Sequence, residues 1–212
     1  MARSDTISPS ARLLFSSHER RATADRSSPR RTAPGLGQNR RVAKKSRSSG
    51  RTGAHAGTPA VALLERERVA HTLHPYEHDP SSDLSYGLEA AAAIGAAPEQ
   101  VLKTLLAVVD GDDLVVGIVP VDRQLDLKAL ARAVGGKRAT MAEPAAAERA
   151  TGYVVGGISP LGQRHAHRTV LDESALTFAV VYVSGGRRGL DVCLSPADLL
   201  RLTAASPAPI AR

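Results

Sequence analysis

The pattern of apolar and polar positions changes abruptly at Thr58. Residues 1–57 are rich in Ser, Arg, Gly and Thr and show no apolar periodicity. A segment of this kind cannot bury enough apolar surface to offset the entropy lost on ordering, so we predict that it is disordered. Regular helix and strand patterns begin at Thr58. We therefore expect one domain at 58–205 and a disordered C-terminal tail at 206–212.

Within 58–205 the apolar pattern predicts alternating groups of helices and strands. Helices are predicted after Thr58 and after Ser195, and at Gly87–Ile94, Pro98–Lys103, Asp126–Val134 and Pro144–Ala150. Strands are predicted at Val69–Tyr76, Thr104–Val109, Leu114–Val121, Tyr153–Ile158, Thr169–Asp172, Phe178–Ser184 and Leu190–Leu194. Short polar or glycine-rich turns join two pairs of these strands into hairpins. The pattern therefore predicts an α+β fold, with a curved, mostly antiparallel mixed sheet or barrel and flanking helices.

The composition and the length of the apolar runs limit the class of protein. Hydrophobic residues make up 42% of the chain and charged residues 23%, as in ordinary globular proteins. The single cysteine, Cys193, excludes an internal disulfide framework and a cysteine-rich metal site. The apolar runs are far shorter than the roughly 20 residues that span a bilayer. We therefore expect a cytoplasmic protein with no membrane partner.

The net charge of +7 is concentrated in the predicted extension. Residues 1–57 hold 13 Lys and Arg against 3 Asp and Glu, a balance of +10, so the rest of the chain carries −3. The positive charge therefore describes the extension and not the domain. Three interpretations of the extension stay open: a basic arm that follows RNA phosphates, a targeting peptide, or translated sequence upstream of the true start.

The first candidate for chemistry is Lys103-Thr104, at the predicted junction between a helix and the strand Thr104–Val109. Apolar neighbours strip water from a lysine, which disfavours its charged form and suits it to chemistry or to holding an anion. The alternative is a surface lysine whose stem lies along apolar neighbours while its amine stays in water.

The second candidate is the glycine-rich stretch Gly156–Gly162, which follows a predicted strand. Paired glycines permit positive φ angles and close approach of a ligand, so the amides at Gly156 and Gly157 could bind a carbonyl oxygen or a phosphate. The alternative is a turn that needs glycine for its geometry alone. The stretch fits neither of the usual phosphate-binding loop patterns.

The third candidate is the predicted hairpin tip between Val183 and Asp191. One interpretation places Ser184 and Asp191 across the hairpin mouth, facing a pocket, with Arg187 and Arg188 positioned to meet RNA phosphates. The other is a glycine-rich hairpin with two solvated arginines.

Other polar residues offer weaker candidates. Cys193 alternates with core positions of its strand, which favours a small buried side chain over a nucleophile. His74 with His78, and His165 with His167, lack a third ligand at a suitable spacing, so we predict no metal site and no cofactor. The chain has no Gly-x-Ser-x-Gly elbow and no identifiable Ser/His/Asp set.

Five motifs follow one another in order along the chain. They are Thr58–Ala60, Tyr76–Pro80, Val101–Leu105, Gly156–Gln163 and Tyr182–Asp191. In this order they resemble the YbaK/EbsC family, which comprises Cys-tRNA(Pro) deacylases homologous to the editing domain of bacterial prolyl-tRNA synthetase. The resemblance runs from Thr58 to roughly Leu202 and omits the extension. Five ordered motifs are far more specific than any one of them.

The resemblance implies a barrel-like, largely antiparallel sheet, and hydrolysis of the ester that joins cysteine to the terminal ribose of tRNA(Pro). It also implies that the substrate's own thiol attacks the ester carbonyl. Lys103 matches the residue that family members cannot lose, and it would anchor the substrate or its ribose–phosphate end. The Gly156-Gly157 backbone would face the carbonyl oxygen. The positions that would line the pocket are Tyr76, Tyr86, Thr104, Gly156, Ser184 and Asp191.

The implied partners are the acceptor end of tRNA(Pro) and, transiently, prolyl-tRNA synthetase, since a free domain of this size has few groups with which to choose a tRNA. No DNA partner is expected. Two alternatives stay open. One is deacylation of Ala-tRNA(Pro) or another small aminoacyl-tRNA, and the other is a non-catalytic module that binds tRNA or the synthetase.

Two positions depart from the family pattern. Tyr86 stands where relatives usually carry Phe, which adds a hydroxyl to the pocket wall. Arg164, His165 and His167 stand where relatives often carry a lysine pair. Positive charge at Arg164 preserves the expected RNA contact, while the histidines could change its pH dependence.

Overall fold

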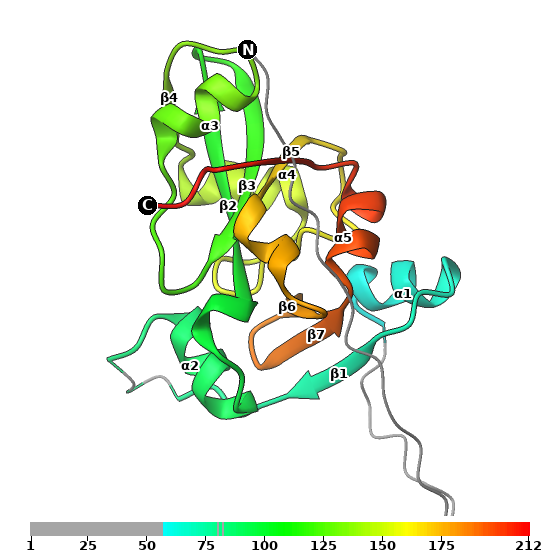
Figure 1. Ribbon diagram of the computed structural model, residues 1–212. Coiled ribbons are helices and arrows are strands. Elements are labelled where there is room, and N and C mark those ends of the chain that lie inside the picture. The colour runs from blue at the N-terminus through cyan, green and yellow to red at the C-terminus, as the bar shows by residue number, and fades with distance from the viewer. Residues whose placement is uncertain (1–56, 80, 82) are drawn as a thin grey trace, which may run out of the picture. The chain divides into compact units, whose positions relative to one another are not determined.

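An eight-stranded mixed sheet forms the centre of the computed structural model, which describes residues 57–79, 81 and 83–212 (Figure 1). Its strands are β1 Thr72–Pro75, β2 Val101–Val109, β3 Asp113–Pro120, β4 Ala139–Met141, β5 Arg168–Asp172, β6 Val181–Arg187, β7 Leu190–Leu194 and β8 Ser206–Ala208. Apart from Gly57, the predicted extension lies outside the described residues. Among those residues, no helix is long and apolar enough to cross a membrane.

The strands are ordered β1-β7-β6-β2-β3-β5-β8, and β4 pairs with β2. The pairs β1–β7, β2–β3, β2–β4 and β6–β7 are antiparallel, whereas β2–β6, β3–β5 and β5–β8 are parallel. The prediction of an α+β fold with a mostly antiparallel mixed sheet is therefore confirmed. Both predicted hairpins are present, as β2–β3 and β6–β7.

Five α-helices and two short 3₁₀ turns flank the sheet in the described chain. They are α1 Pro59–Arg66, α2 Tyr86–Ile94, η1 Pro98–Gln100, α3 Leu127–Ala133, α4 Pro144–Thr151, η2 Glu173–Thr177 and α5 Pro196–Thr203. The first and last of the helices begin as predicted, each with a capping hydroxyl followed by proline. Thr58 Oγ1 accepts the amide of Val61, and Ser195 Oγ accepts the amide of Asp198.

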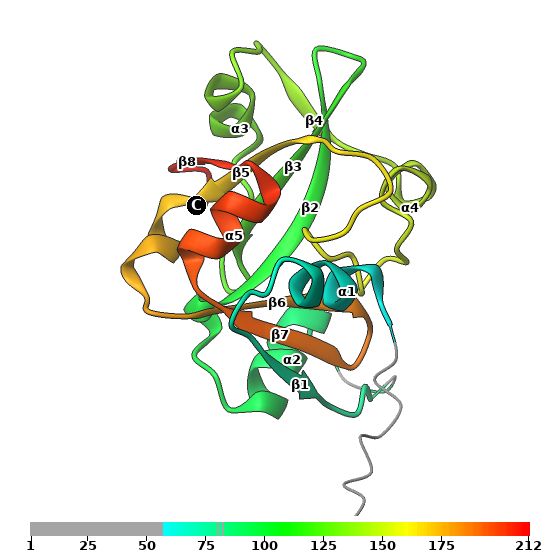
Figure 2. The same cartoon turned by 90° about the vertical axis from the view of Figure 1, so that its right-hand side faces the viewer.

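Alternate residues of the central strands enter two different cores, which explains why those strands are apolar on both faces. In β3, Val116 and Ile118 belong to the larger core, which includes side chains of α1 and α5. Val115 and Val119 belong to a second core, which includes side chains of α3. Figure 2 shows α1 and α5 in front of the sheet and α3 at its far end.

The predicted helix Pro98–Lys103 is wrong beyond its first turn. Only η1 is helical, and β2 begins at Val101, so Lys103 lies inside a strand and not at its junction with a helix. Val101 and Leu102 pair with β6 in parallel, a long-range contact that local helix signals do not contain.

The predicted strand Tyr153–Ile158 is also absent. Tyr153 is buried and its hydroxyl donates to the carbonyl of Leu161 at 2.8 Å, while Val154 and Val155 are exposed. The apolar residues here resemble a strand in sequence, but Tyr153 enters the core while Val154 and Val155 face outward in an irregular loop.

The C-terminal residues are ordered, so the prediction of a disordered tail at 206–212 is wrong. β8 pairs in parallel with β5, and Ile210 is fully buried. The buried carboxylate of Asp172 accepts the amides of Ile210 and Ala211 at 2.9 and 2.7 Å. The segment is too short to show a periodic pattern of its own, and backbone pairing with distant residues orders it.

One edge of β2 is only partly covered. β3 pairs along one edge from Leu102 to Val109. On the other edge, β6 pairs with Val101 and Leu102, and β4 pairs only from Ala107 onward. No strand of the described chain pairs with residues 103–106 on this edge. This gap between β6 and β4 is where a cavity opens.

Candidate active site

A cavity of about 330 Å³ lies beside the uncovered stretch of β2. Most of the residues that line it belong to α2, β2, α4, the 154–158 loop and the β6–β7 hairpin, and the others lie in β4 or beside β1, α2 and β4. The lining residues are Tyr76, Ser85, Tyr86, Gly87, Ala90, Val101, Leu102, Lys103, Thr104, Leu105, Leu106, Met141, Ala142, Pro144, Ala147, Val155, Gly156, Ile158, Ser184 and Asp191. Most of this lining is apolar, and the few polar groups converge from separate elements. That combination is typical of a small-molecule site.

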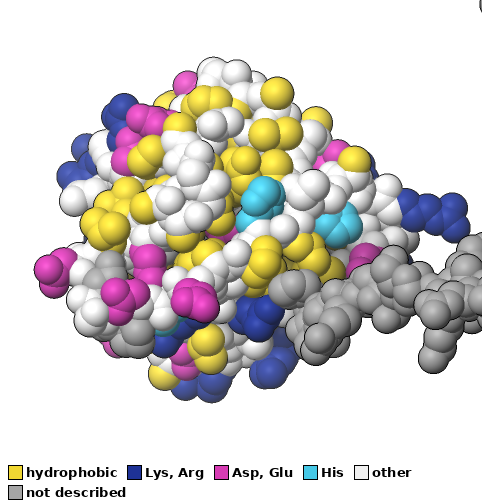
Figure 3. All heavy atoms as spheres, turned by 90° about the horizontal axis from the view of Figure 1, so that it is seen from below, with side chains coloured by type: hydrophobic (Ala, Val, Ile, Leu, Met, Phe, Trp, Pro, Cys, Tyr) yellow, Lys and Arg dark blue, Asp and Glu magenta, His cyan; other side chains and the backbone are white. Residues whose placement is uncertain are grey.

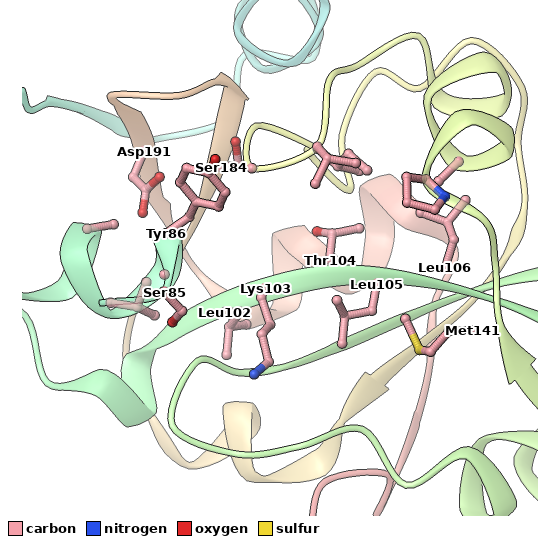
Figure 4. Close-up of a pocket in the computed structure, with 18 of the residues that line it drawn as sticks. Ser85, Tyr86, Leu102, Lys103, Thr104, Leu105, Leu106, Met141, Ser184 and Asp191 are labelled. Carbon is pink, nitrogen blue, oxygen red and sulfur yellow. The ribbon is translucent and has the colours of Figure 1, made fainter. Parts of the chain in front are cut away.

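Ser184 and Asp191 face each other across the β6–β7 hairpin, as in one of the two interpretations of its sequence. They form the last regular pair before the ladder shifts register between Ser184 and Arg187. Figure 4 shows both residues at one end of the cavity with Tyr86, and Met141 at the opposite end. The hairpin therefore supplies the polar end of an otherwise apolar cavity.

Asp191 is a buried carboxyl, with only 5% of its surface exposed. Burial raises its pKa to about 6. Tyr76 lies on the same side, and its pKa is raised to about 12 by burial and by the negative charge of Asp191. A buried carboxylate without a cationic partner is costly. A cationic group of a ligand at this end of the cavity would lower that cost.

Three serine or threonine side chains line the cavity, those of Ser85, Thr104 and Ser184, and among the described residues no base is hydrogen-bonded to any of their hydroxyls. Ser184 Oγ accepts the amide of Gly186 at 3.2 Å. Thr104 Oγ1 is fully buried and has no hydrogen-bond partner among the described residues. A serine or threonine nucleophile needs an adjacent base to be activated. The arrangement around these hydroxyls therefore lacks the geometry of a triad.

Lys103 lines the cavity with its stem but turns its amine away from the polar end. Nζ donates to the carbonyl of Val121 at 3.2 Å. In Figure 4 the amine lies on the opposite side of β2 from Ser184 and Asp191. Burial lowers the pKa of Lys103, and the charge of Asp122 partly opposes this shift. The Lys103 amine is therefore partly desolvated, as one interpretation of the sequence predicted, but it points away from the polar end of the cavity.

The two glycines of the 154–158 loop have different environments. Gly156 lines the cavity and has a φ of +85°. Gly157 is not among the residues that line the cavity, and its amide donates to the carbonyl of Val154 at 2.9 Å. A Cβ at Gly157 would lie 2.8 Å from backbone atoms of Arg187. This glycine therefore permits close packing of the loop against the hairpin, and the role of the Gly156-Gly157 backbone toward a carbonyl oxygen stays a prediction.

The three arginines predicted to contact RNA differ in their contacts. Arg188 donates twice to the carbonyl of Val155, with Nε at 3.0 Å and Nη2 at 2.7 Å. Arg164 is exposed, and its Nη1 donates to the carbonyl of Arg149 at 3.3 Å. Arg187 is exposed at the end of β6. Contact of any of them with RNA stays a prediction.

A contact that the sequence did not indicate fixes the loop between β1 and α2. His78 Nδ1 lies 2.8 Å from Glu89 Oε2, and the amide of Asp79 donates to the other oxygen of Glu89. The Asp79 amide and His78 hold the pKa of Glu89 below its usual value. The sequence has no motif that links His78 and Asp79 to Glu89, because their contact depends on how α2 packs against this loop.

Charge is mixed on the face that carries α2 and β1. Seen from the side of α2 and β1, Lys and Arg side chains lie in separate groups among hydrophobic and acidic ones (Figure 3). Within the described part of the chain, no three His, Cys, Asp or Glu residues gather as metal ligands would.

Known proteins resemble this chain in sequence and in structure. A family model of the aminoacyl-tRNA editing domain matches residues 85–202. EbsC of Enterococcus faecalis, named provisionally as a Cys-tRNA(Pro)/Cys-tRNA(Cys) deacylase, is 34% identical over 146 residues, which cover 69% of this chain and 88% of that protein. The multifunctional Ser/Thr-tRNA deacylase ProXp-y of Escherichia coli K12 is 34% identical over 112 residues, or 51% of this chain and 67% of that protein.

A solved structure shares the fold. A crystal structure described provisionally as a trans-editing enzyme for prolyl-tRNA synthetase matches with a TM-score of 0.62 and 28% identity. The match covers 73% of this chain and 95% of that one.

Proposed function

The chain belongs to the aminoacyl-tRNA editing domain family, and from this premise we propose that it is a trans-editing deacylase that hydrolyses the ester of mischarged Cys-tRNA(Pro). The observation that carries this proposal is a small, mainly apolar cavity that ends on a buried carboxyl and offers no activated hydroxyl. Such a cavity suits an aminoacyl group whose own side chain supplies the nucleophile.

Asp191 is assigned to the α-ammonium group of the aminoacyl ester. With a pKa of about 6 it is mostly ionised at neutral pH, and it is buried with no ion pair to a cationic side chain of the described chain. The ammonium group would offset the cost of that buried charge and would fix the ester in the cavity. Tyr76, beside Asp191, adds a hydroxyl for the same end of the ligand.

Lys103 is assigned to anchoring the substrate at its ribose–phosphate end. Its amine donates to the carbonyl of Val121 in the free protein, so it must leave that acceptor to meet the substrate. The four-carbon stem of lysine permits such a movement. A partly desolvated amine also forms a stronger contact with an anion than a fully hydrated one.

The reaction balances with the substrate's own groups. The thiol sulfur attacks the ester carbonyl carbon, a C–S bond forms, and the bond from that carbon to the ribose oxygen breaks. The thiol proton ends on the ribose oxygen, and water then opens the cyclic thioester to free cysteine. The protein contributes position and electrostatic stabilisation of the carbonyl oxygen.

A second substrate class has one observation in its favour. Thr104 Oγ1 is buried, lines the cavity wall and has no partner in the described residues. A substrate hydroxyl could supply that partner, and sites built to bond a hydroxyl discriminate strongly for it. Seryl- and threonyl-tRNA are therefore the second candidate substrates.

The acceptor end of tRNA(Pro) and a transient complex with prolyl-tRNA synthetase are the proposed partners, in the cytoplasm where tRNA is charged. The domain itself carries a net −3, so its charge offers little to hold a whole tRNA. A synthetase that already holds the tRNA would supply the missing contacts.

The test is parallel deacylation of Cys-, Ala-, Ser- and Thr-tRNA by the full chain, with and without prolyl-tRNA synthetase. We expect Cys-tRNA(Pro) to be hydrolysed fastest, and the synthetase to raise its rate. Faster hydrolysis of Ser- or Thr-tRNA would select the second candidate. Binding of tRNA without hydrolysis of any of the four would refute the enzyme and leave a binding module.

A further inference from the structure

We propose that Arg188 is a positioning residue that holds one wall of the cavity in place from the tip of the β6–β7 hairpin. This inference rests on the proposed function, because it names what keeps that site in shape. It replaces the expectation that Arg188 contacts an RNA phosphate. The wall concerned consists of Val155, Gly156 and Tyr86, all of which line the cavity.

The first observation is a double hydrogen bond across the fold. Nε and Nη2 of Arg188 both donate to the carbonyl of Val155, at 3.0 and 2.7 Å. Arg188 stands in the turn between β6 and β7, and Val155 belongs to an irregular loop 33 positions earlier in the chain. No strand of the described part of the chain pairs with that loop, so the Arg188 guanidinium links the loop to the sheet.

The second observation is the stacking of the same guanidinium on Tyr86. The Arg188 carbon Cζ lies 4.7 Å from the centre of the Tyr86 ring. The ring of His78 lies 5.1 Å from the Tyr86 ring, at 51° to it. Tyr86 is the first residue of α2, so the stack connects the hairpin tip to a second element of the wall.

The third observation is how closely Gly156 fits between these groups. A Cβ added at Gly156 would lie 2.8 Å from Arg188 Nε and 2.9 Å from the Tyr86 ring. The glycine thus lets the loop approach the arginine and the tyrosine at once. One interlocked wall is thus formed by Arg188, Gly156 and Tyr86. The Arg188 guanidinium contacts both the 154–158 loop and α2.

The chemistry of the side chain explains why arginine is needed here. A guanidinium is planar, so its edge can donate to one carbonyl while its face lies on an aromatic ring. A lysine at this position keeps the charge but has neither the fork nor the face. The Arg188→Lys variant therefore keeps the positive charge but removes the double hydrogen bond and the stacking surface, so it tests the geometry of the contact apart from its charge.

The test uses the full chain with Arg188→Lys, Arg188→Ala and the control Arg132→Lys, which changes an exposed arginine on α3. Amide hydrogen exchange of the 153–162 segment is measured in the free protein. We expect both Arg188 variants to speed exchange there by about 10-fold or more, and Arg132→Lys to leave it unchanged. Unchanged exchange in both Arg188 variants overturns the proposal.

Deacylation kinetics give an independent readout. A positioning role predicts that Arg188→Lys lowers kcat by roughly 10-fold, with little change in KM and no change in how the rate depends on salt. A phosphate contact predicts the reverse: Arg188→Lys retains activity, and Arg188→Ala raises KM with a salt slope smaller by about one. The second pattern overturns the proposal.

Failure of the proposed function looks different from failure of this inference. If no aminoacyl-tRNA is hydrolysed by the unmodified chain, the deacylase proposal fails while the exchange result still decides the role of Arg188. A circular dichroism melting curve for each variant shows whether it is folded. Should both Arg188 variants fail to fold, Tyr86→Leu removes the stack alone, and unchanged exchange at 153–162 in that variant counts against the interlocked wall.

Discussion

Ser184 and Asp191 form the last regular cross-strand pair of the β6–β7 hairpin, immediately before its ladder shifts register. This places one hydroxyl and one buried carboxyl side by side at the polar end of the cavity. Beyond the shift, Arg188 in the hairpin turn donates to the carbonyl of Val155 in the 154–158 loop. The β6–β7 hairpin therefore contributes to two parts of the site, the polar end of the cavity and the wall formed by the 154–158 loop.

The raised pKa of Asp191 predicts how activity depends on pH. If the carboxylate holds the substrate ammonium, kcat/KM for Cys-tRNA(Pro) rises with pH through about 6, the pKa of this group. Asp191→Asn should lose most of the activity together with this rise. A variant that keeps both would show that the carboxylate has no part in binding or chemistry.

The same group predicts a stability effect of opposite sign. Folding raises the pKa of Asp191 from 3.8 to about 6, so the folded protein holds a proton that the unfolded chain releases between those values. Stability should therefore fall as pH rises through this window, and the penalty persists above it. Asp191→Asn should raise the free energy of unfolding at pH 7 by about 2–3 kcal/mol. Urea unfolding at pH 4 and pH 7 measures this. A destabilised variant at pH 7 would mean that the carboxylate has a stabilising partner.

Thr104 and Thr151 form a matched pair of buried hydroxyls. Thr104 Oγ1 lacks a hydrogen-bond partner among the described residues, whereas Thr151 Oγ1 donates to Ala147 and accepts the amide of Tyr153. Replacing an unpaired hydroxyl with a methyl group removes a cost, so Thr104→Val should stabilise the fold by about 1 kcal/mol. Thr151→Val should destabilise it by about 1–2 kcal/mol, because the Tyr153 amide loses its acceptor.

Deacylation rates on different substrates show whether the Thr104 hydroxyl serves catalysis or the choice of the aminoacyl side chain. Thr104→Val should leave Cys-tRNA(Pro) deacylation nearly unchanged and reduce any hydrolysis of Ser- or Thr-tRNA. Equal losses on all substrates would show that the hydroxyl serves catalysis and not the choice of side chain.

The last residues of the chain are predicted to stabilise the fold. One carboxylate oxygen of Asp172 accepts the amides of Ile210 and Ala211. The other oxygen accepts the amide and the hydroxyl of Ser174. Asp172→Ala should lower the free energy of unfolding by about 3 kcal/mol, because buried amides lose a charged acceptor. Thermal unfolding measures this, with Asp112→Ala in the exposed β2–β3 turn as the control. A change no larger than that of the control would show that the C-terminal segment adds nothing to the core.

The sequence predicted those parts of the fold that local signals determine. Thr58 and Ser195 cap helices where their hydroxyls and following prolines predicted them, and both hairpins formed around polar or glycine-rich turns. Local signals failed where distant residues decide the structure. β2 starts early because β6 pairs with Val101, and β8 exists because β5 pairs with it.

The candidate site could be predicted only in part, again because distant residues decide some of its contacts. Tyr76, Thr104, Ser184 and Asp191, which the ordered motifs singled out, line one cavity, and their binding of a substrate stays a prediction. The contacts of Lys103 and Arg188 could not be predicted, because the acceptors of both side chains are carbonyls of distant residues. Backbone carbonyls carry no sequence signal, so only the fold shows where a long side chain ends.

The most direct test of the deacylase proposal is the rate of Cys-tRNA(Pro) hydrolysis by the unmodified chain, Lys103→Ala and Lys128→Ala. Lys128 is an exposed lysine on α3 and serves as the matched control. We predict rapid hydrolysis by the unmodified chain and by Lys128→Ala, and a loss of roughly 100-fold or more in Lys103→Ala, as for removal of a group that holds the reacting end of a substrate. Near-normal hydrolysis by Lys103→Ala would contradict the role given to Lys103, and no hydrolysis by the unmodified chain would contradict the deacylase itself.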